Sequence, residues 1–243
     1  MLQKLKLKNP PIKEALISIA FSHPIGIQLN DLNLFLNAII NEYPNKNPQS
    51  EVRVKLNSDT PEKTTEVTGY LLSSIDSKQH IIVNFNSISF HRVAPYESWE
   101  NLIKEAKIYW KRFYLQFPDI QIHQISVRYI NVMDIKFKEG EGFENYLSLL
   151  PHIPDNLPKI VEGYFLQLKI PEPIKNLFSV VTEFFTLNQD IVEITLDVNV
   201  MKNLDNLPSD DNNLWILFED LRVFKNDIFF NSITEKTKNL YND

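Results

Sequence analysis

Apolar and polar residues alternate along several segments of the first half of the chain, which is the pattern of strands with one buried face. Within residues 12–21, Ala15, Ile17, Ile19 and Phe21 share one face and predict a largely buried strand. The same alternation predicts further strands at residues 51–56, 64–73, 79–85, 88–92 and 122–135. Asn86-Ser87 separates the third and fourth of these segments, so we expect a hairpin with a two-residue turn.

Three segments instead repeat apolar residues at helical spacing. Residues 30–43 carry one apolar stripe that Pro44 ends, and residues 96–116 carry a second stripe that Pro118 ends. Residues 211–230 form a third predicted helix, whose main stripe is Leu214, Leu217, Phe218, Leu221, Phe224 and Ile228.

The second half of the chain alternates strands with proline-rich loops. Strands are predicted at residues 163–170, 177–186 and 191–201, after a short helix at 143–150. The charged segment 138–142 is the best internal boundary, which gives halves 1–137 and 138–243, although one continuous domain fits equally well. Strands with short connections and few helices predict an α+β fold, with a mainly antiparallel sheet and two or three long helices packed on one face.

Charge and composition narrow the range of functions. The net charge of −6 opposes binding to phosphate backbones, so nucleic acid is disfavoured as a partner. The chain has no cysteine, which excludes disulfides and thiol chemistry and is typical of a cytoplasmic protein. With only five glycines, phosphate-cradling loops are disfavoured. No segment approaches the roughly 18 apolar residues needed to span a membrane.

Motifs for common cofactors and metals are missing from the sequence, and we expect neither a cofactor nor a metal. The five histidines do not occur in pairs at metal-ligand spacing on a helix. His80 and His91 share a face of the predicted hairpin as diagonal neighbours, about 7–8 Å apart. They would need a third ligand to hold a metal, so two histidines on a partly solvated face is the simpler interpretation.

The densest polar group in a predicted strand is the segment from Arg128 to Asp134. Alternation places Arg128 and Asp134 on one face, and Tyr129 and Asn131 on the other. A buried guanidinium requires a carboxylate or carbonyl partner, and Asp134, Glu193 and Asp197 are the candidates. The segment forms either an anion-binding site or an ion pair that fixes the strand register.

Aromatic residues supply the remaining candidates for binding. Tyr96 and Trp99 begin the second predicted helix, where they can line a pocket or anchor the core. Trp215 and Phe229 lie off the centre of the stripe on the third helix, and Phe230 lies at its end. Aromatic anchors are enriched at interfaces, so this helix is expected to contact a second copy or another protein. The alternative is a helix buried on several sides within the fold.

Several segments together resemble a sporadically distributed prokaryotic family of uncharacterised proteins of about this length. The segments are Pro11-Ile12-x-Glu14-Ala15, Pro95-Tyr96-Glu97-x-Trp99, Arg128-Tyr129-Ile130-Asn131, Leu196-Asp197-Val198 and Ile228-Phe229-Phe230-x-Ser232-Ile233-Thr234. The resemblance spans nearly the whole chain but transfers no catalytic residue. The patchy distribution of the family is similar to that of genes on mobile elements, such as toxin–antitoxin and phage-defence modules.

Two functions follow as hypotheses. The first is a non-enzymatic protein that binds a protein partner or forms a homodimer, within a mobile defence or antitoxin-type gene module. The second is a protein that binds or hydrolyses a small anionic molecule in a pocket near Arg128, between sheet and helix. The residues assign no catalytic role, and whether the protein is an enzyme stays open, with the missing motifs favouring a non-enzyme.

Overall fold

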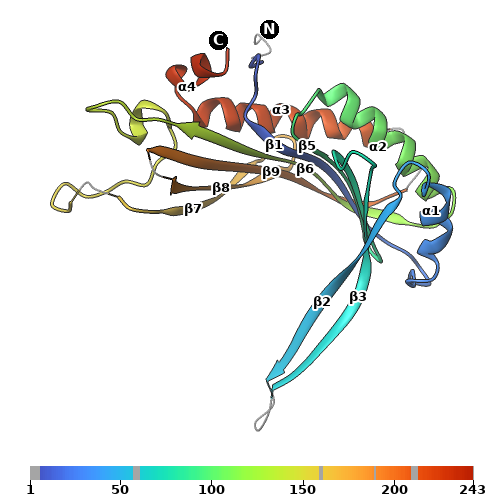
Figure 1. Ribbon diagram of the computed structural model, residues 1–243. Coiled ribbons are helices and arrows are strands. Elements are labelled where there is room, and N and C mark those ends of the chain that lie inside the picture. Colours follow the sequence, from blue (N-terminus) through green and yellow to red (C-terminus); the bar gives the residue numbers. More distant parts are fainter. Residues whose placement is uncertain (1–5, 57–60, 159–160, 189, 209–212, 243) are drawn as a thin grey trace.

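The computed structural model describes residues 6–56, 61–158, 161–188, 190–208 and 213–242. It has an α+β fold with one nine-stranded antiparallel sheet and four helices, which confirms the predicted class (Figure 1). The strands are β1 Ile12–Ser22, β2 Asn45–Leu56, β3 Pro61–Ser73, β4 Gln79–Asn84, β5 Ser87–Val93, β6 Gln121–Ile135, β7 Phe165–Glu172, β8 Leu177–Asn188 and β9 Ile191–Pro208. The helices are α1 Leu32–Ala38, α2 Trp99–Tyr114, α3 Leu214–Ser232 and α4 Glu235–Leu240.

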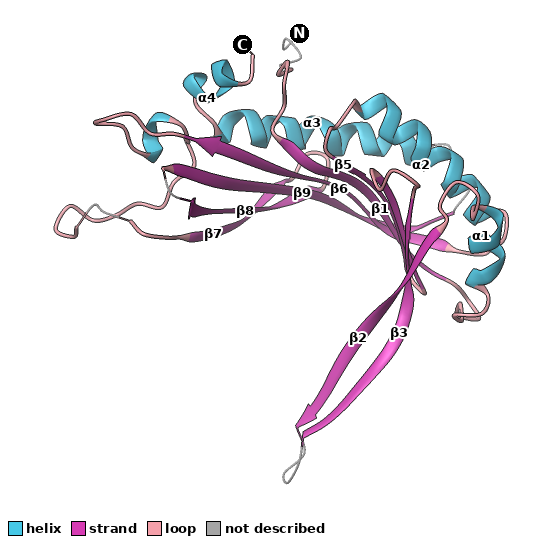
Figure 2. Cartoon of the chain, in the orientation of Figure 1, coloured by secondary structure: helices cyan, strands magenta, loops and turns pink. Residues whose placement is uncertain are grey.

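The strand order in the sheet is β2-β3-β4-β5-β1-β6-β9-β8-β7. The N-terminal strand β1 therefore lies near the centre, where it pairs with β5 on one side and β6 on the other. The predicted boundary at residues 137 and 138 falls in the loop after β6, and sheet pairing continues across it from β6 to β9. Helices α1, α2 and α3 lie over the same face of the sheet (Figure 2).

Apolar residues of β1, β4, β5, β6, β8 and β9 are buried on the face that these helices cover and form most of the core. In β1 the predicted face is confirmed, since Ala15, Ile17, Ile19 and Phe21 are all buried. Ile17 is paired with Phe90 in β5, which is also buried. The other face, which we call the open face, carries residues that are mostly half-buried or exposed.

Helix α2 matches its sequence pattern well, because signals at both ends agree with the apolar stripe. Ser98 accepts a hydrogen bond from the Asn101 amide and so caps the helix, which begins at Trp99. Lys111 and Arg112 lie in its last turn, where cations complement the helix dipole. Phe113 is fully buried, and its ring packs with those of Phe21, Phe35, Trp110 and Phe117.

Two predicted helices are shorter than expected. The helix at 30–43 contains only α1, because Ile39 leaves helical geometry with φ −123° and ψ 6°. The apolar stripe continues through a turn instead, and the Tyr43 hydroxyl bonds the carboxylate of Glu105 in α2. The helix at 143–150 contains only the 3-10 turn Phe143–Asn145. In the third predicted helix, the start at residues 211–212 lies outside the described residues, and α3 runs to Ser232.

The β2–β3 hairpin projects away from the open face (Figure 1). Strand β3 pairs with β4 only over residues 69–73, so the outer part of the hairpin is a two-stranded ribbon. The ribbon separates from the rest of the sheet at a β-bulge between Gln49 and Ser50, next to the pairing of Gln49 with Gly69. A Cβ on Gly69 would lie 2.1 Å from the Val83 carbonyl oxygen, so this close approach requires glycine.

Among the described residues, none of the helices has the length and apolar content that crossing a membrane requires.

We expect Gly69→Ala to lower the free energy of unfolding by about 1–3 kcal/mol, because the added methyl group must displace the β4 backbone. Gly163→Ala is the matched control, since a Cβ there meets nothing within 4 Å. Urea denaturation of both variants measures the difference. Equal stability of the two variants would contradict the close packing of β3 against β4.

Candidate functional site

Polar side chains gather along the middle of the open face, across strands that are distant in sequence. Cross-strand pairing aligns Ser73, His80, His91, Leu16 and Arg128 in one row, from β3 through β4, β5 and β1 to β6. A neighbouring row contains Glu14, Ile130, Asp197 and Thr182, and a third contains Ser89, Ser18, Ser126 and Met201. We call Ser73, His80, Ser89, His91, Glu14, Arg128 and Asp197 the polar band.

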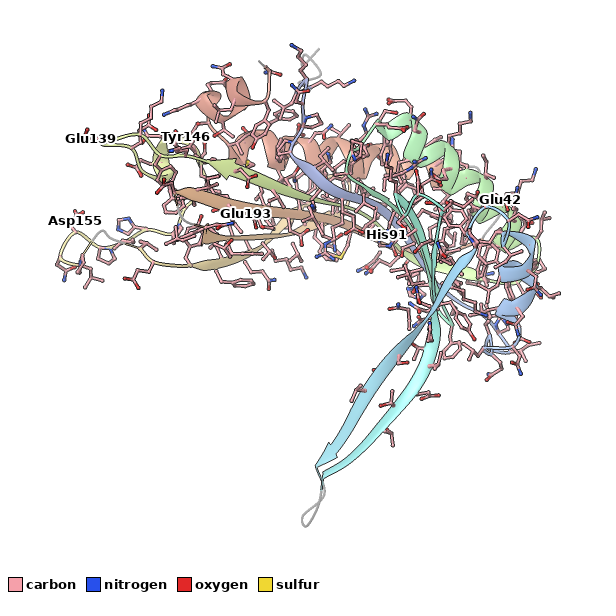
Figure 3. All side chains as sticks on the ribbon, viewed as in Figure 1. Glu42, His91, Glu139, Tyr146, Asp155 and Glu193 are labelled. Atoms are coloured by element: carbon pink, nitrogen blue, oxygen red, sulfur yellow. The ribbon has the colours of Figure 1, made fainter. Side chains whose placement is uncertain are left out.

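At the centre of the polar band, Ser89, His91 and Glu14 form a chain of hydrogen bonds. Ser89 Oγ lies 2.7 Å from His91 Nε2, and His91 Nδ1 lies 2.5 Å from Glu14 Oε1. Ser89 and His91 are two residues apart in β5 and therefore share a face, while Glu14 comes from β1. His91 lies where the sheet bends toward the β2–β3 hairpin (Figure 3). The His91 side chain is 10% exposed and that of Glu14 is 27% exposed.

Glu14 carries a negative charge in this arrangement. Its hydrogen bond with His91 lowers the pKa of the carboxyl group below the ordinary value, against the opposing effect of burial, and the nearby charge of Arg128 adds to the lowering. A carboxylate only accepts hydrogen bonds, so His91 donates from Nδ1. In the neutral imidazole, Nε2 is then the acceptor for the Ser89 hydroxyl.

His80 is the second histidine of the polar band, and it is directly opposite His91. The predicted diagonal arrangement is wrong, because the turn consists of Phe85 and Asn86 rather than Asn86 and Ser87. The residue opposite His80 therefore changes by two positions, from Val93 to His91. His80 Nδ1 lies 2.8 Å from Ser73 Oγ, and burial lowers the pKa of His80. In the described part of the chain, no group of three or more histidine, aspartate or glutamate residues is placed to hold a metal ion.

Arg128 lies on the open face, one strand beyond β1. Its Nε and Nη2 atoms donate to Asp197 at distances of 2.6–3.1 Å, so Asp197 is the partner among the three carboxylates that the sequence offered. Arg128 is 40% exposed and Asp197 is 14% exposed. Asp134 shares this face but is exposed and paired with Glu193 across the strands. The predicted alternation is confirmed, since Tyr129 and Asn131 are buried on the opposite face.

Tyr129 and Tyr96 meet between the sheet and the helices. Their hydroxyl oxygens are 2.6 Å apart, and their rings are in edge-to-face contact. Above the Tyr129 ring, at 3.6 Å from its centroid, lies Nζ of Lys225 in α3. Lys225 is buried, and its ammonium group donates to Asn226 Oδ1 at 2.6 Å. Burial lowers the pKa of Lys225 to about 7, with a further contribution from the charge of Arg222.

The other polar candidates on the helix side are satisfied within the fold. The buried Asn131 amide donates to the Leu196 carbonyl oxygen at 3.0 Å and so links β6 to β9. The Trp99 indole donates to Glu219 of α3, and the Arg222 guanidinium lies 5.4 Å from the centroid of the Trp99 ring. Trp99 therefore anchors α2 to α3 rather than facing solvent.

The aromatic residues of α3 are less exposed than the sequence suggested. Phe229 is buried, with an exposed fraction of 6%, and it contacts the half-buried Phe230 edge-to-face. Trp215 is also half-buried and is stacked on Phe218 at 5.5 Å. The exposed apolar residues of this helix are Ile216 and Val223.

A buried carboxyl group that the sequence analysis did not single out lies in β8. Glu183 has an exposed fraction of 0% and accepts a hydrogen bond of 2.7 Å from the Tyr164 hydroxyl. Among the described residues, its Oε2 atom has no hydrogen-bond partner. Burial raises the pKa of Glu183 to about 7, although the Tyr164 bond acts in the opposite direction.

Sequence reasoning missed Ser89, Glu14 and Lys225 as candidates. Ser89 and His91 are alternate residues in a predicted strand whose other face is apolar, so the sequence places them on one polar face. Glu14 is a charged residue within a strand that is predicted to be largely buried, which also marks it as unusual. Their meeting depends on the pairing of β5 with β1, two strands about 70 residues apart that nothing in the local pattern connects. Lys225 lies on the apolar side of α3, and a cation at such a position is the feature of the sequence that could have identified it.

The sequence matches no protein-family model and no curated protein.

We expect Arg128→Ala to lower the free energy of unfolding by about 1–2 kcal/mol, because it leaves the largely buried charge of Asp197 unpaired. The effect stays below that of a fully buried pair because water reaches Arg128. Lys136→Ala is the control, since Lys136 and Asp190 are both exposed and 4.0 Å apart. Chemical denaturation measures both, and a loss under about 0.5 kcal/mol for Arg128→Ala would show a solvated pair.

The raised pKa of Glu183 makes the stability dependent on pH. Between about pH 4.5 and 7 the folded chain holds a proton on Glu183 that the unfolded chain has released, so stability falls as pH rises through this window. We expect Glu183→Gln to remove a decrease of roughly 3 kcal/mol across the window. Denaturation midpoints of the wild type and variant at several pH values measure the decrease. The exposed Glu193→Gln should retain it, and parallel wild-type and Glu183→Gln profiles would contradict the assignment.

Proposed function

We propose that this protein binds a protein partner on the open face of its sheet, which extends from the projecting β2–β3 hairpin to β7 at the opposite edge. The observation that carries the proposal is that α1, α2 and α3 all lie over one face (Figure 1), while the residues of the other face are mostly half-buried or exposed. Sheets whose second face is not covered normally carry polar residues there. This open face carries aromatic residues as well.

The aromatic patch, which consists of Phe165, Phe178 and Phe184, occupies the β7–β8 end of the open face. Phe165 is 68% exposed, and its ring is stacked on that of Phe184 at 6.4 Å. Lys169 Nζ lies 4.6 Å from the centroid of the Phe178 ring. Exposed aromatic groups bordered by polar residues are typical of protein-binding surfaces.

The hairpin supplies a second surface for the partner. A two-stranded ribbon has marginal stability in water when no third strand or helix supports it. The outer part of β2–β3 pairs with no other strand among the described residues. A protein that contacts both the hairpin and the open face would bury more area than either surface offers alone.

The alternative of an anionic small molecule beside Arg128 has less support. Arg128 lies on the face opposite the helices, and two of its three guanidinium nitrogens are bonded to Asp197. The net charge of −6 gives no support to a nucleic-acid partner. We further propose that the partner is encoded next to this chain in a mobile defence or antitoxin-type module, as the family resemblance suggests.

The test is co-expression with the products of the adjacent genes, followed by sedimentation of the purified protein with and without each product. We expect a stable complex whose dissociation constant rises at least about tenfold with Phe165→Asp, as for an aromatic anchor in an interface. Ile216→Asp is the matched control, because Ile216 is 63% exposed on the helix side.

Loss of the complex with Ile216→Asp instead would place the interface on α3, as the sequence analysis proposed for a homodimer or a hetero-complex. A chain that sediments as a monomer alone and with every adjacent gene product would contradict the proposal.

A further inference from the structure

Beyond partner binding, we propose that Ser89 is an activated nucleophile that accepts an acyl group from a carboxylic ester. His91 is the general base, and Glu14 holds its imidazole in place. The proposal rests on the chain of hydrogen bonds from Ser89 Oγ to His91 Nε2 at 2.7 Å and from His91 Nδ1 to Glu14 Oε1 at 2.5 Å. It is independent of whether a protein binds the same face.

The order of the atoms in this triad suits nucleophilic catalysis. The base must present one ring nitrogen to the hydroxyl while a carboxylate binds the other and fixes the tautomer. Glu14 is bonded to Nδ1, which leaves Nε2 free to accept the Ser89 proton. The imidazolium that forms is then stabilised by the Glu14 carboxylate, and all three groups sit on paired strands rather than on loops.

The surroundings of Ser89 are open enough for a substrate. Ser89 is half-buried on the open face, and its cross-strand neighbours are Ile82 on β4 and Ser18 on β1. The next residues in the same row are Ser126 and Met201. Small hydroxyl residues beside Ser89 leave room above the sheet, and the apolar residues at either side favour an uncharged acyl group.

Negative charge that develops on the acyl oxygen needs donors on the same face. The hydroxyl of Ser18 is directly opposite Ser89, and Cβ atoms of such pairs are about 4.5–5.5 Å apart. Arg128 adds a fixed positive charge to this face, in the row next to that of Ser89. A single hydroxyl and a guanidinium already bonded to Asp197 stabilise this charge less than a directed pair of backbone amides would, so we expect slow turnover.

The reaction conserves atoms and charge at each step. Ser89 Oγ bonds to the acyl carbon as its proton moves to His91 Nε2, and the ester C–O bond breaks as that proton passes to the departing alkoxide. A water molecule then gives a proton to His91 and its hydroxide to the acyl carbon. The acyl–Oγ bond then breaks as His91 Nε2 returns that proton to Ser89 Oγ, and a carboxylic acid and an alcohol are the products.

An alkyl fluorophosphonate tests the nucleophile directly, because its P–F bond breaks as an Oγ–P bond forms. We expect stoichiometric labelling of the full chain at Ser89, located by peptide mass spectrometry. His91→Gln should slow labelling at least about 100-fold, the usual contribution of a general base, whereas Ser148→Ala, at an exposed serine away from the open face, should leave the rate unchanged. Absence of label at Ser89, or equal rates in the wild type and His91→Gln, would overturn the proposal.

A second test remains informative if some of those variants fail to fold. The chain has no cysteine, so Ser89→Cys and Ser126→Cys each introduce a single thiol. Beside His91 the thiol should ionise well below the ordinary pKa of about 8.5, so its alkylation by iodoacetamide should reach half its maximum at least about one pH unit lower than in Ser126→Cys. Identical pH profiles for the two thiols would show that His91 does not activate position 89.

Discussion

Coverage of the sheet on one face only is the constraint on which the rest of this structure depends. Side chains alternate along each strand, so the strands beneath the helices send half of their residues to the helices and half to the open face. In β6 the consequence is direct: Val127 and Tyr129 are buried, whereas Arg128 between them is 40% exposed. Apolar packing is thereby confined to one layer, and the polar band and aromatic patch lie together on the other.

Two ionisable groups are exceptions to this separation of apolar and polar faces. Their shifted pKa values reflect the free-energy cost of burying a charge. Lys225 and Glu183 both lie on the helix side, and burial moves their pKa values toward 7 from opposite directions. Burial disfavours the ionised form of each group, because few hydrogen bonds replace its hydration. Lys225 lies against the Tyr129 ring and Asn226, and Glu183 accepts a hydrogen bond from the Tyr164 hydroxyl. Packing alone does not explain either residue.

The sequence predicted the fold class and the faces of the strands because those depend on local alternation. Ile17 and Ile19 were assigned to a buried face from their own segment, and both are buried. The predicted helix at 30–43 is longer than the observed helix α1. The apolar spacing continues beyond α1 through a turn, and Tyr43 links this turn to Glu105. The Ser89–His91–Glu14 triad was beyond reach for a different reason. It depends on which strands become neighbours, and that is decided by the fold as a whole.

The core and the triad are nevertheless specified by the same feature, the register between β1 and β5. Ile17 pairs with Phe90 on the buried face, and this pairing sets Glu14 beside His91 on the open face. A slip of one residue would move every side chain of β1 to the opposite face, so Glu14 would enter the core and Ile17 would be exposed. Burial of Ile17 therefore selects the register in which the carboxylate reaches the imidazole. The packing that stabilises the helix side also positions the polar chemistry of the open face.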